Sequence, residues 1–172
     1  MIRGEKPFIS CGFTVETRGF AKSGLRQEMS TGNTVHEVRL TRGASLTGKV
    51  LQEGKPVANA GIGITGVKAD VFNASYYVAT DDRGQFSFAN IPPNRDYYLF
   101  GIMKSLKDRG SLSLRRVHVD GDGSVKDVGD LNLKPGCTVA GTVRLRNGEP
   151  APKNCVVTLC LTVMTPPPAG ES

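Results

Sequence analysis

The sequence is poor in the residues on which most active sites depend. It has no tryptophan, only two histidines, and an aromatic share of 6% over 172 residues. No stretch brings together a nucleophile, a base and an orienting group, and the two histidines, His36 and His118, stand far apart. Metal-dependent and general-base catalysis are therefore not expected. We expect a chain that is not an enzyme, with no catalytic residue, no cofactor and no metal site.

Long apolar runs and nucleic-acid recognition elements are also missing. No apolar run approaches the roughly 20 residues that cross a bilayer, and Met1 to Ser10 lacks the apolar core of a signal peptide. The chain alone therefore does not indicate a localisation, and we expect no direct membrane insertion. The net charge is +6, but without interleaved aromatic residues or a recognition helix we expect no nucleic-acid binding. The densest basic stretch surrounds a Gly-Ser turn and is interpreted as a solvated hairpin; it contains Lys104, Lys107, Arg109, Arg115 and Arg116.

The four cysteines form no metal-binding or redox motif. Cys11, Cys137, Cys155 and Cys160 include no CxxC pair, and no histidine stands at zinc-finger spacing. Cys155 and Cys160 are five residues apart, which on one strand places them on opposite faces. A disulfide from Cys137 to one of these two stays open as an alternative, and buried free thiols are favoured.

What the sequence has in quantity is turn residues between short apolar runs. It contains 21 glycines and 10 prolines, and the segments between them are rich in Val, Ile, Thr and Leu, which favours an all-β chain. Short strands at regular spacing are typical of an antiparallel sandwich. The seven expected strands are Ala44 to Leu51, Ala60 to Val67, Ser75 to Thr80, Gln85 to Ala89, Tyr97 to Met103, Leu112 to Val119 and Lys126 to Leu133.

The chain repeats itself with a period of roughly 90 residues, the size of one small sandwich domain. The stretch "VRLTRGASLTGKVLQEGKPVANAGIGI" returns from Leu131 as "LNLKPGCTVAGTVRLRNGEPAPKNCVV", and "FISCGFTV" returns from Tyr97 as "YYLFGIMK". We therefore expect residues 43–134 to form one complete sandwich. Residues 1–42 are expected to be the C-terminal part of a preceding copy, 135–165 the N-terminal part of a further copy, and 166–172 a disordered tail.

Each flanking piece is expected to expose unpaired strand edges. Phe8 to Leu40 would supply the last three strands of a sandwich, and Thr138 to Val163 the first two. Unpaired edges readily accept other strands. We therefore expect the two pieces either to pair with each other or to promote self-association of the chain.

The repeat also assigns side-chain directions in the segment "DYYLFGIM", where nearly every residue is apolar. Aligned with Phe8 to Val15, the positions apolar in both copies are Tyr98, Phe100 and Ile102, which match Ile9, Cys11 and Phe13. Because side chains alternate along a strand, these positions are expected in the core. The same alternation turns Tyr97 outward and makes it the one candidate ligand-contact residue.

Two motifs resemble sites for phosphate or zinc. "GASLTGKV" from Gly43 has the body of a phosphate-binding loop, but Val50 cannot hold magnesium and no helix follows. "HEVRL" from His36 has Leu40 where a zinc-protease motif needs histidine. Both are expected to lie on strands.

Two acidic pairs also resemble sites. Asp120 and Asp122 have calcium-like spacing without the terminal glutamate of a calcium loop, and Asp81 and Asp82 stand close to tyrosines. Both pairs are interpreted as turns, because Asp and Gly favour turns. Asn73 in "NAS" fits a glycosylation acceptor.

Three segments of the chain follow one another in a characteristic order: "LTGKVLQEGKPVANAGIGI", "ATDDRGQFSFANIPPNRDYYLFGI" and "VHVDGDGSVKDVGDLNL". In this order they resemble the carboxypeptidase regulatory-like domain. The resemblance implies a transthyretin-like or prealbumin-like β-sandwich, also grouped with carbohydrate-binding-like folds: seven antiparallel strands with Greek-key topology, here flanked by partial copies.

The resemblance implies a non-enzymatic module in a tandem array, acting as spacer or scaffold in a larger cell-surface or periplasmic protein. Its partners would be neighbouring repeats or domains. The alternative is a carbohydrate-binding module, whose glycan partner would need an exposed aromatic platform. In related collagen-adhesin B-type repeats a lysine is crosslinked to Asn or Asp. The nearest candidates here, Lys49 and Asn132, alternate with apolar neighbours and should face outward, so no isopeptide bond is expected.

Overall fold

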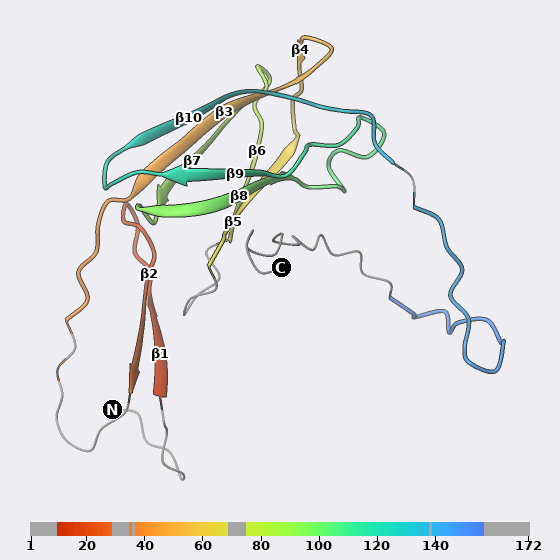
Figure 1. Cartoon of the computed structure of the whole chain (residues 1–172), viewed down its shortest axis with the longest axis horizontal. Coiled ribbons are helices and arrows are strands. Elements are labelled where there is room, and N and C mark those ends of the chain that lie inside the picture. The colour runs from red at the N-terminus through yellow and green to blue at the C-terminus, as the bar shows by residue number, and fades with distance from the viewer. Residues whose placement is uncertain (1–9, 29–34, 36, 69–74, 138, 157–172) are drawn as a thin grey trace, which may run out of the picture. The chain divides into compact units, whose positions relative to one another are not determined.

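The computed structural model of the chain describes residues 10–28, 35, 37–68, 75–137 and 139–156, and every regular element within them is a β-strand (Figure 1). Accordingly, no described segment forms a helix that could cross a membrane. The expected all-β class is confirmed. The strands are β1 (Ser10–Val15), β2 (Ser23–Glu28), β3 (Ala44–Gln52), β4 (Lys55–Pro56), β5 (Gly61–Gly66), β6 (Ser75–Ala79), β7 (Gln85–Ile91), β8 (Arg95–Gly101), β9 (Arg115–Val119) and β10 (Val125–Asn132).

Strands β3 to β10 form two four-stranded sheets. In the first, here called the β3 sheet, β3 pairs with β10 on one side and with β7 and the short β4 on the other. In the second, the β5 sheet, the order is β6-β5-β8-β9. The chain passes between the sheets after β4, β6, β7 and β9, so strands that are neighbours in space are often distant in sequence.

One hydrophobic cluster lies between the two sheets and makes them a sandwich. Alternating residues of each strand point into it, as the period of two along a strand requires. The β3 sheet contributes Ala44, Leu46, Val50, Phe86, Phe88, Ile91, Val128 and Leu131, and the β5 sheet contributes Ile62, Ile64, Tyr97, Leu99, Val117 and Val119.

The seven expected strands coincide with β3 and β5 to β10 to within three residues at each end. Strand β4 was not expected. The expectation of an entirely antiparallel sandwich is wrong for one pair, because β10 runs parallel to β3. The first and last strands of the sandwich become neighbours after the intervening strands have crossed between the sheets, and they then point the same way.

The side-chain directions predicted for β8 are wrong. Tyr97 and Leu99 are fully buried, whereas Tyr98 and Phe100 are partly exposed on the opposite face. The prediction assumed that positions apolar in both copies of the repeat are core positions. In β8 both faces are apolar, so the criterion could not distinguish them and selected the outer face. Because side chains alternate along a strand, an assignment that is wrong by one residue exchanges the inner and outer faces of the whole strand.

The connection between β8 and β9 is a compact loop rather than a solvated hairpin. Leu106 is buried in it, and a Cβ at Gly101 would lie 2.4 Å from the Leu106 Cδ1. The Arg109 guanidinium donates to the carbonyl oxygens of Ala58 (2.7 Å), Asn59 (3.2 Å) and Ser105. This arginine therefore fixes the loop to the turn that precedes β5.

The N-terminal flank differs from the expected three strands. Its described residues contain a two-stranded antiparallel hairpin, β1 with β2, in which Phe13 faces Leu25. Residues 37–40, expected on a strand, have no regular structure. Cys11 was expected in the core and is only partly buried, because the two-stranded hairpin has no second sheet to cover its apolar face within the described residues.

The chain divides into two compact units, Met1–Cys137 and Thr138–Ser172. In the second, the described residues show one isolated bridge, Arg144 to Pro150, closed by a turn in which Gly148 has a φ of 88°. Cys137 and Cys155 are exposed free thiols, so the expectation of buried thiols is wrong for them. The described residues do not include Cys160, the tail 166–172 or most of the second of the two strands expected between Thr138 and Val163.

Candidate functional site

The outer side of the β5 sheet carries three aromatic side chains, Tyr77 from β6 and Tyr98 and Phe100 from β8. Tyr77 is 61% exposed, and its ring meets that of Phe100 edge-on, with centroids 6.4 Å apart and planes at 76°. Tyr98 lies two residues before Phe100 on the same face of the strand. We call these three residues the aromatic face.

Strand β5 provides the floor of the aromatic face. Gly63 is the register partner of both Tyr77 and Phe100. A Cβ at Gly63 would lie 2.6 Å from the Phe100 ring, so the ring rests directly on the backbone of β5. Absence of a side chain at this position is what allows that close approach.

A polar group adjoins the aromatic face on β8 and β9. The Asp96 carboxylate accepts a hydrogen bond from Arg116 Nη2 at 2.7 Å and lies 3.0 Å from His118 Nδ1. The hydrogen bond from Arg116, followed by that from His118, lowers the pKa of Asp96, and Asp96 in turn raises the pKa of Arg116. Arg116 is the register partner of Tyr98, so these charges border the rings.

The arrangement of rings and polar groups is a surface that suits ligand binding. Aromatic faces pack against flat apolar surfaces, and neighbouring donors and acceptors then fix the orientation of a ligand. Within the described residues, no group of three or more His, Cys, Asp or Glu side chains could hold a metal ion.

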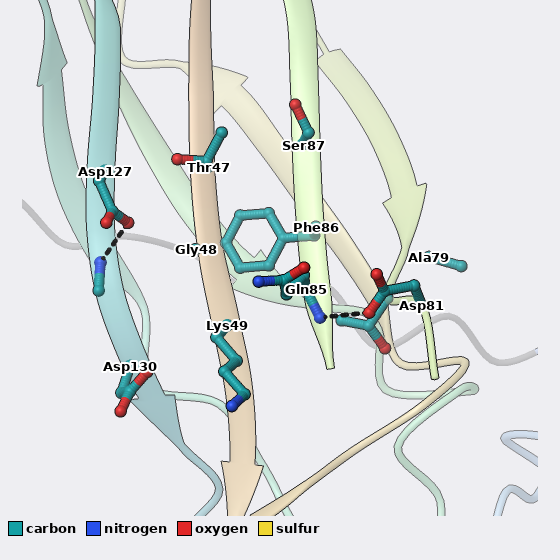
Figure 2. A pocket seen from close by; sticks show the side chains of 12 residues that line it. Thr47, Gly48, Lys49, Ala79, Asp81, Gln85, Phe86, Ser87, Asp127 and Asp130 are labelled. Carbon is teal, nitrogen blue, oxygen red and sulfur yellow. Dashed lines mark hydrogen bonds between the residues drawn. The ribbon is translucent and has the colours of Figure 1, made fainter. Parts of the chain in front are cut away.

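A shallow hollow of about 590 Å³ lies on the outer side of the β3 sheet (Figure 2). Two of its acidic side chains bind the main chain: Asp81 Oδ1 accepts from the backbone N–H of Gln85 at 2.7 Å, and Asp127 Oδ1 accepts from Gly129 N–H at 2.8 Å. Lys49 and Asp130 are register partners on the same surface. The hollow is lined by Thr47, Gly48, Lys49, Ala79, Thr80, Asp81, Gln85, Phe86, Ser87, Asp127, Gly129 and Asp130.

Tyr97, the candidate ligand-contact residue, does not lie on the surface. Its side chain is 0% exposed, and its hydroxyl donates to the Pro92 carbonyl oxygen at 2.7 Å. The outward direction predicted from the repeat is therefore wrong, for the reason given for β8. The residues that occupy the surface are its neighbour Tyr98 and, two positions further along, Phe100.

The acidic pairs form turns, as interpreted. Asp81 accepts from the backbone N–H groups of Arg83 and Gln85, and Gly84 has a φ of 74°. Asp122 Oδ1 accepts from Gly43 N–H at 2.6 Å, which joins the turn before β10 to the start of β3.

The phosphate-loop motif lies on β3, as expected, and His118 is exposed. His36 of the zinc-like motif and the acceptor Asn73 lie outside the described residues. Asn132 is exposed, and Lys49 lies on the outer hollow, so both face outward as predicted.

Three of the five clustered basic residues are engaged within the fold. Arg109 holds the β8–β9 loop, Arg115 Nη1 donates to the Val128 carbonyl at 2.9 Å, and Arg116 binds Asp96. Lys104 and Lys107 are exposed. The stretch is thus largely a set of structural contacts.

Sequence reasoning missed Tyr77 and Phe100 as surface residues. A signal was available in "GIGIT", where Gly61 and Gly63 alternate with buried Ile62 and Ile64. Glycines at every second position leave one face of a strand without side chains, which indicates that another group approaches that face closely. Here the group is the Phe100 ring.

Comparisons with known proteins give no family for the chain. No protein-family model matches it, and no curated protein matches it. Among solved structures, a double mutant of the shaft pilin SpaA from Lactobacillus rhamnosus GG is similar at 11% identity and a TM-score of 0.39, over 56% of this chain and 47% of that one. A 9R-lipoxygenase from Cyanothece PCC8801 is similar at 14% identity and a TM-score of 0.35, over 61% of this chain and 18% of that one. Both scores are too low to indicate a family or a function.

Proposed function

We propose that the chain is a non-enzymatic structural module, one link in a tandem array of β-sandwiches that spaces or scaffolds other domains of a larger extracytoplasmic protein. One observation carries the proposal. The chain enters the sandwich at Ala44, where β3 begins, and leaves it at Asn132, where the parallel strand β10 ends. Since parallel strands begin at the same end of a pair, these two points lie at opposite ends of the sheet.

The second unit supports the tandem arrangement. In the sandwich, Leu51 pairs with Pro56 across a turn in which Gly54 has a φ of 77°. In the second unit, Arg144 pairs with Pro150 across a turn in which Gly148 has a φ of 88°. A glycine turn that leads to a paired proline thus recurs at the positions that the sequence repeat aligns, and it is one residue longer in the second unit.

The internal contacts of the sandwich support its assignment to the carboxypeptidase regulatory-like class and a non-catalytic role. The stretch "TDDRGQFSF", one of the segments that carry the resemblance, spans the turn before β7 and the first four residues of that strand. Thr80 and Asp81 both bind main-chain groups there. Side chains that suggested chemistry thus stabilise the fold.

The spacer function can be tested by small-angle X-ray scattering. The measurement compares the maximum dimension of the full chain with that of a protein in which two copies of the full chain are joined in tandem. A link of this geometry is expected to lengthen the particle by at least the length of β3, about 30 Å for nine residues. A two-copy protein whose maximum dimension stays close to that of one copy contradicts the spacer function.

The aromatic face favours a carbohydrate-binding role as a second function. A sugar ring presents a flat apolar surface and several hydroxyls, which suit the rings of Tyr77 and Phe100 and the neighbouring Asp96 and Arg116. Glycan-array binding that is lost in Tyr77→Ala and kept in Val125→Ala, an exposed apolar site on the other sheet, would support this role. No binding across a broad array would exclude it.

Self-association through the N-terminal hairpin is proposed as a further partner interaction. Strands β1 and β2 pair only with each other among the described strands, which leaves the outer edge of each without a partner strand. Such edges accept another strand. Sedimentation of the full chain over a range of concentrations is expected to show dimers or larger species, and a monomer throughout contradicts the proposal.

A further inference from the structure

The pairing of β3 with β10 has a mechanical consequence. The two strands are parallel in two blocks, Val125–Asp127 with Ser45–Thr47 and Asp130–Asn132 with Lys49–Leu51. Tension along the chain pulls the start of β3 one way and the end of β10 the other way. The strands are then loaded in shear, so that the hydrogen bonds of both blocks carry the load together instead of opening one after another.

We propose that the β3–β10 pair is a shear clamp that lets the module bear tension. This inference rests on the proposed spacer function, because only a module linked at both ends is stretched. Strands β3 and β10 are the strands next to the points where the chain enters and leaves the sandwich. No strand of the β5 sheet is adjacent in sequence to either point, so no pair in that sheet is loaded directly.

The side chains of the clamp are interlocked. Val128 of β10 packs over Gly48 of β3, where a Cβ would lie 2.6 Å from the Val128 Cγ2 and 2.7 Å from the Phe86 Cζ. Val50, fully buried, is the next inward-facing residue of β3. Tension moves β10 toward the end of β3, which drives Val128 from the space above Gly48 against Val50. Because protein cores are close-packed, this sliding requires the core to open.

Each end of the clamp is also latched. At the start of β3, Gly43 N–H donates to Asp122 Oδ1 at 2.6 Å and the Gly43 carbonyl accepts from Gly123 N–H at 2.9 Å. At the end of β10, Ser111 and Lys134 exchange two backbone hydrogen bonds of 2.8 and 2.9 Å. These bonds hold the chain at the two points where tension arrives.

The clamp is tested by pulling the full chain in two directions with optical tweezers. All four cysteines are changed to serine, and handles are attached at exposed positions. Arg42→Cys with Lys134→Cys loads the strand pair in shear, while Lys55→Cys with Lys134→Cys pulls from one end of the pair and peels it. The shear pair is expected to unfold at a force several-fold above the peel pair, in one step that releases about 30 nm of chain.

A matched pair of core variants separates the clamp from general stability. Val128→Ala and Val117→Ala remove the same two methyl groups from positions that are 6% and 5% exposed, but only Val128 lies in the clamp. Both are expected to lower the denaturant midpoint by similar amounts. Forced unfolding reports the rate along the pulled direction, so only Val128→Ala is expected to lower the shear force.

Equal forces in shear and peel, or equal losses of shear force in the two variants, overturn the clamp. These outcomes are distinct from failure of the spacer function. If the tandem protein lengthens and shear resistance is low, the clamp alone is wrong. If the tandem protein does not lengthen and shear resistance is high, the clamp stands without the spacer.

Discussion

The two sheets of the sandwich share one core and differ on the faces that point away from it. The outer side of the β3 sheet is polar around the shallow hollow, where Thr47, Lys49, Gln85 and Ser87 lie. The outer side of the β5 sheet carries the aromatic face. The β3 sheet also contains both strands through which the chain enters and leaves. The difference matches the two proposals made above: load bearing is assigned to the β3 sheet, and ligand binding to the β5 sheet.

The largest expected effect separates the inside of the β5 sheet from its outside. Tyr97→Ala removes a ring that is 0% exposed and should cost about 3–5 kcal/mol of unfolding free energy. Tyr77→Ala removes a ring that is 61% exposed and should cost about 1 kcal/mol, from its contact with Phe100. Chemical denaturation of both variants measures the difference.

Tyr97→Phe is the control for the first comparison. It keeps the ring and removes only the hydroxyl that donates to Pro92, so it should cost about 1 kcal/mol. If Tyr77→Ala proves as costly as Tyr97→Ala, the two faces of the sheet do not differ in the way described.

The next effect compares one glycine from each sheet. Gly48→Ala on β3 places a Cβ against Val128 and Phe86 inside the core, and overpacking of this kind costs up to about 3 kcal/mol. Gly63→Ala on β5 meets only the far edge of the Phe100 ring, which can move outward, so it should cost about 0.5 kcal/mol or less.

Denaturation of both glycine variants tests this prediction, with Gly121→Ala as a control because the nearest atom to its added Cβ is 3.9 Å away. Gly63→Ala should also displace Phe100, which would appear as a change in tyrosine fluorescence that is absent when the same substitution is made together with Tyr77→Phe. A larger loss of stability in Gly63→Ala than in Gly48→Ala would reverse the comparison.

Most of the strands could be predicted from the sequence because turn residues delimit them. Gly84 and Asn94, in the turns before β7 and β8, have φ values of 74° and 54°, and Gly and Asn are the residues that adopt this conformation most readily. The faces of β8 could not be predicted in the same way. A strand with apolar residues on both sides shows no alternation of apolar and polar residues, so its buried face cannot be identified from the pattern. The repeat alignment did not resolve this, because it assumed that both copies bury the same side.

Two other features also lay beyond local patterns. The parallel pairing of β3 and β10 depends on where the chain crosses between the sheets, which no segment by itself encodes. The loop that buries Leu106 and uses Arg109 has a mixed polar composition that resembles a solvated loop. The role of Arg109 is clear only from its hydrogen bonds to the carbonyl groups of Ala58 and Asn59, which lie some 50 positions earlier in the chain.

A smaller effect is expected where the chain passes between the sheets. Thr80, which is 2% exposed, donates to the Val57 carbonyl at 2.6 Å and accepts from Ala60 N–H at 2.8 Å. Thr80→Val leaves both groups without this partner and should cost about 1–2 kcal/mol. Thr65→Val, which removes a partly buried contact with Ser75, should cost about 0.5 kcal/mol. Equal thermal shifts in the two variants would contradict this.

The smallest expected effect is a dependence on pH that belongs to the β5 sheet. The hydrogen bond from Arg116, and then that from His118, lowers the pKa of Asp96 in the folded chain. A carboxyl whose folded pKa lies below its unfolded value of about 3.9 contributes stability above that value and loses it as the pH falls through the folded pKa. Asp96→Asn should therefore reduce stability slightly near neutral pH and not in acid. Asp82→Asn, on an exposed turn, is the matched control. Denaturation midpoints measured from neutral pH down into acid should depend on pH differently in the two variants. If the midpoints of both variants change with pH in the same way, the Asp96–Arg116 pair does not stabilise the outer side of the sheet.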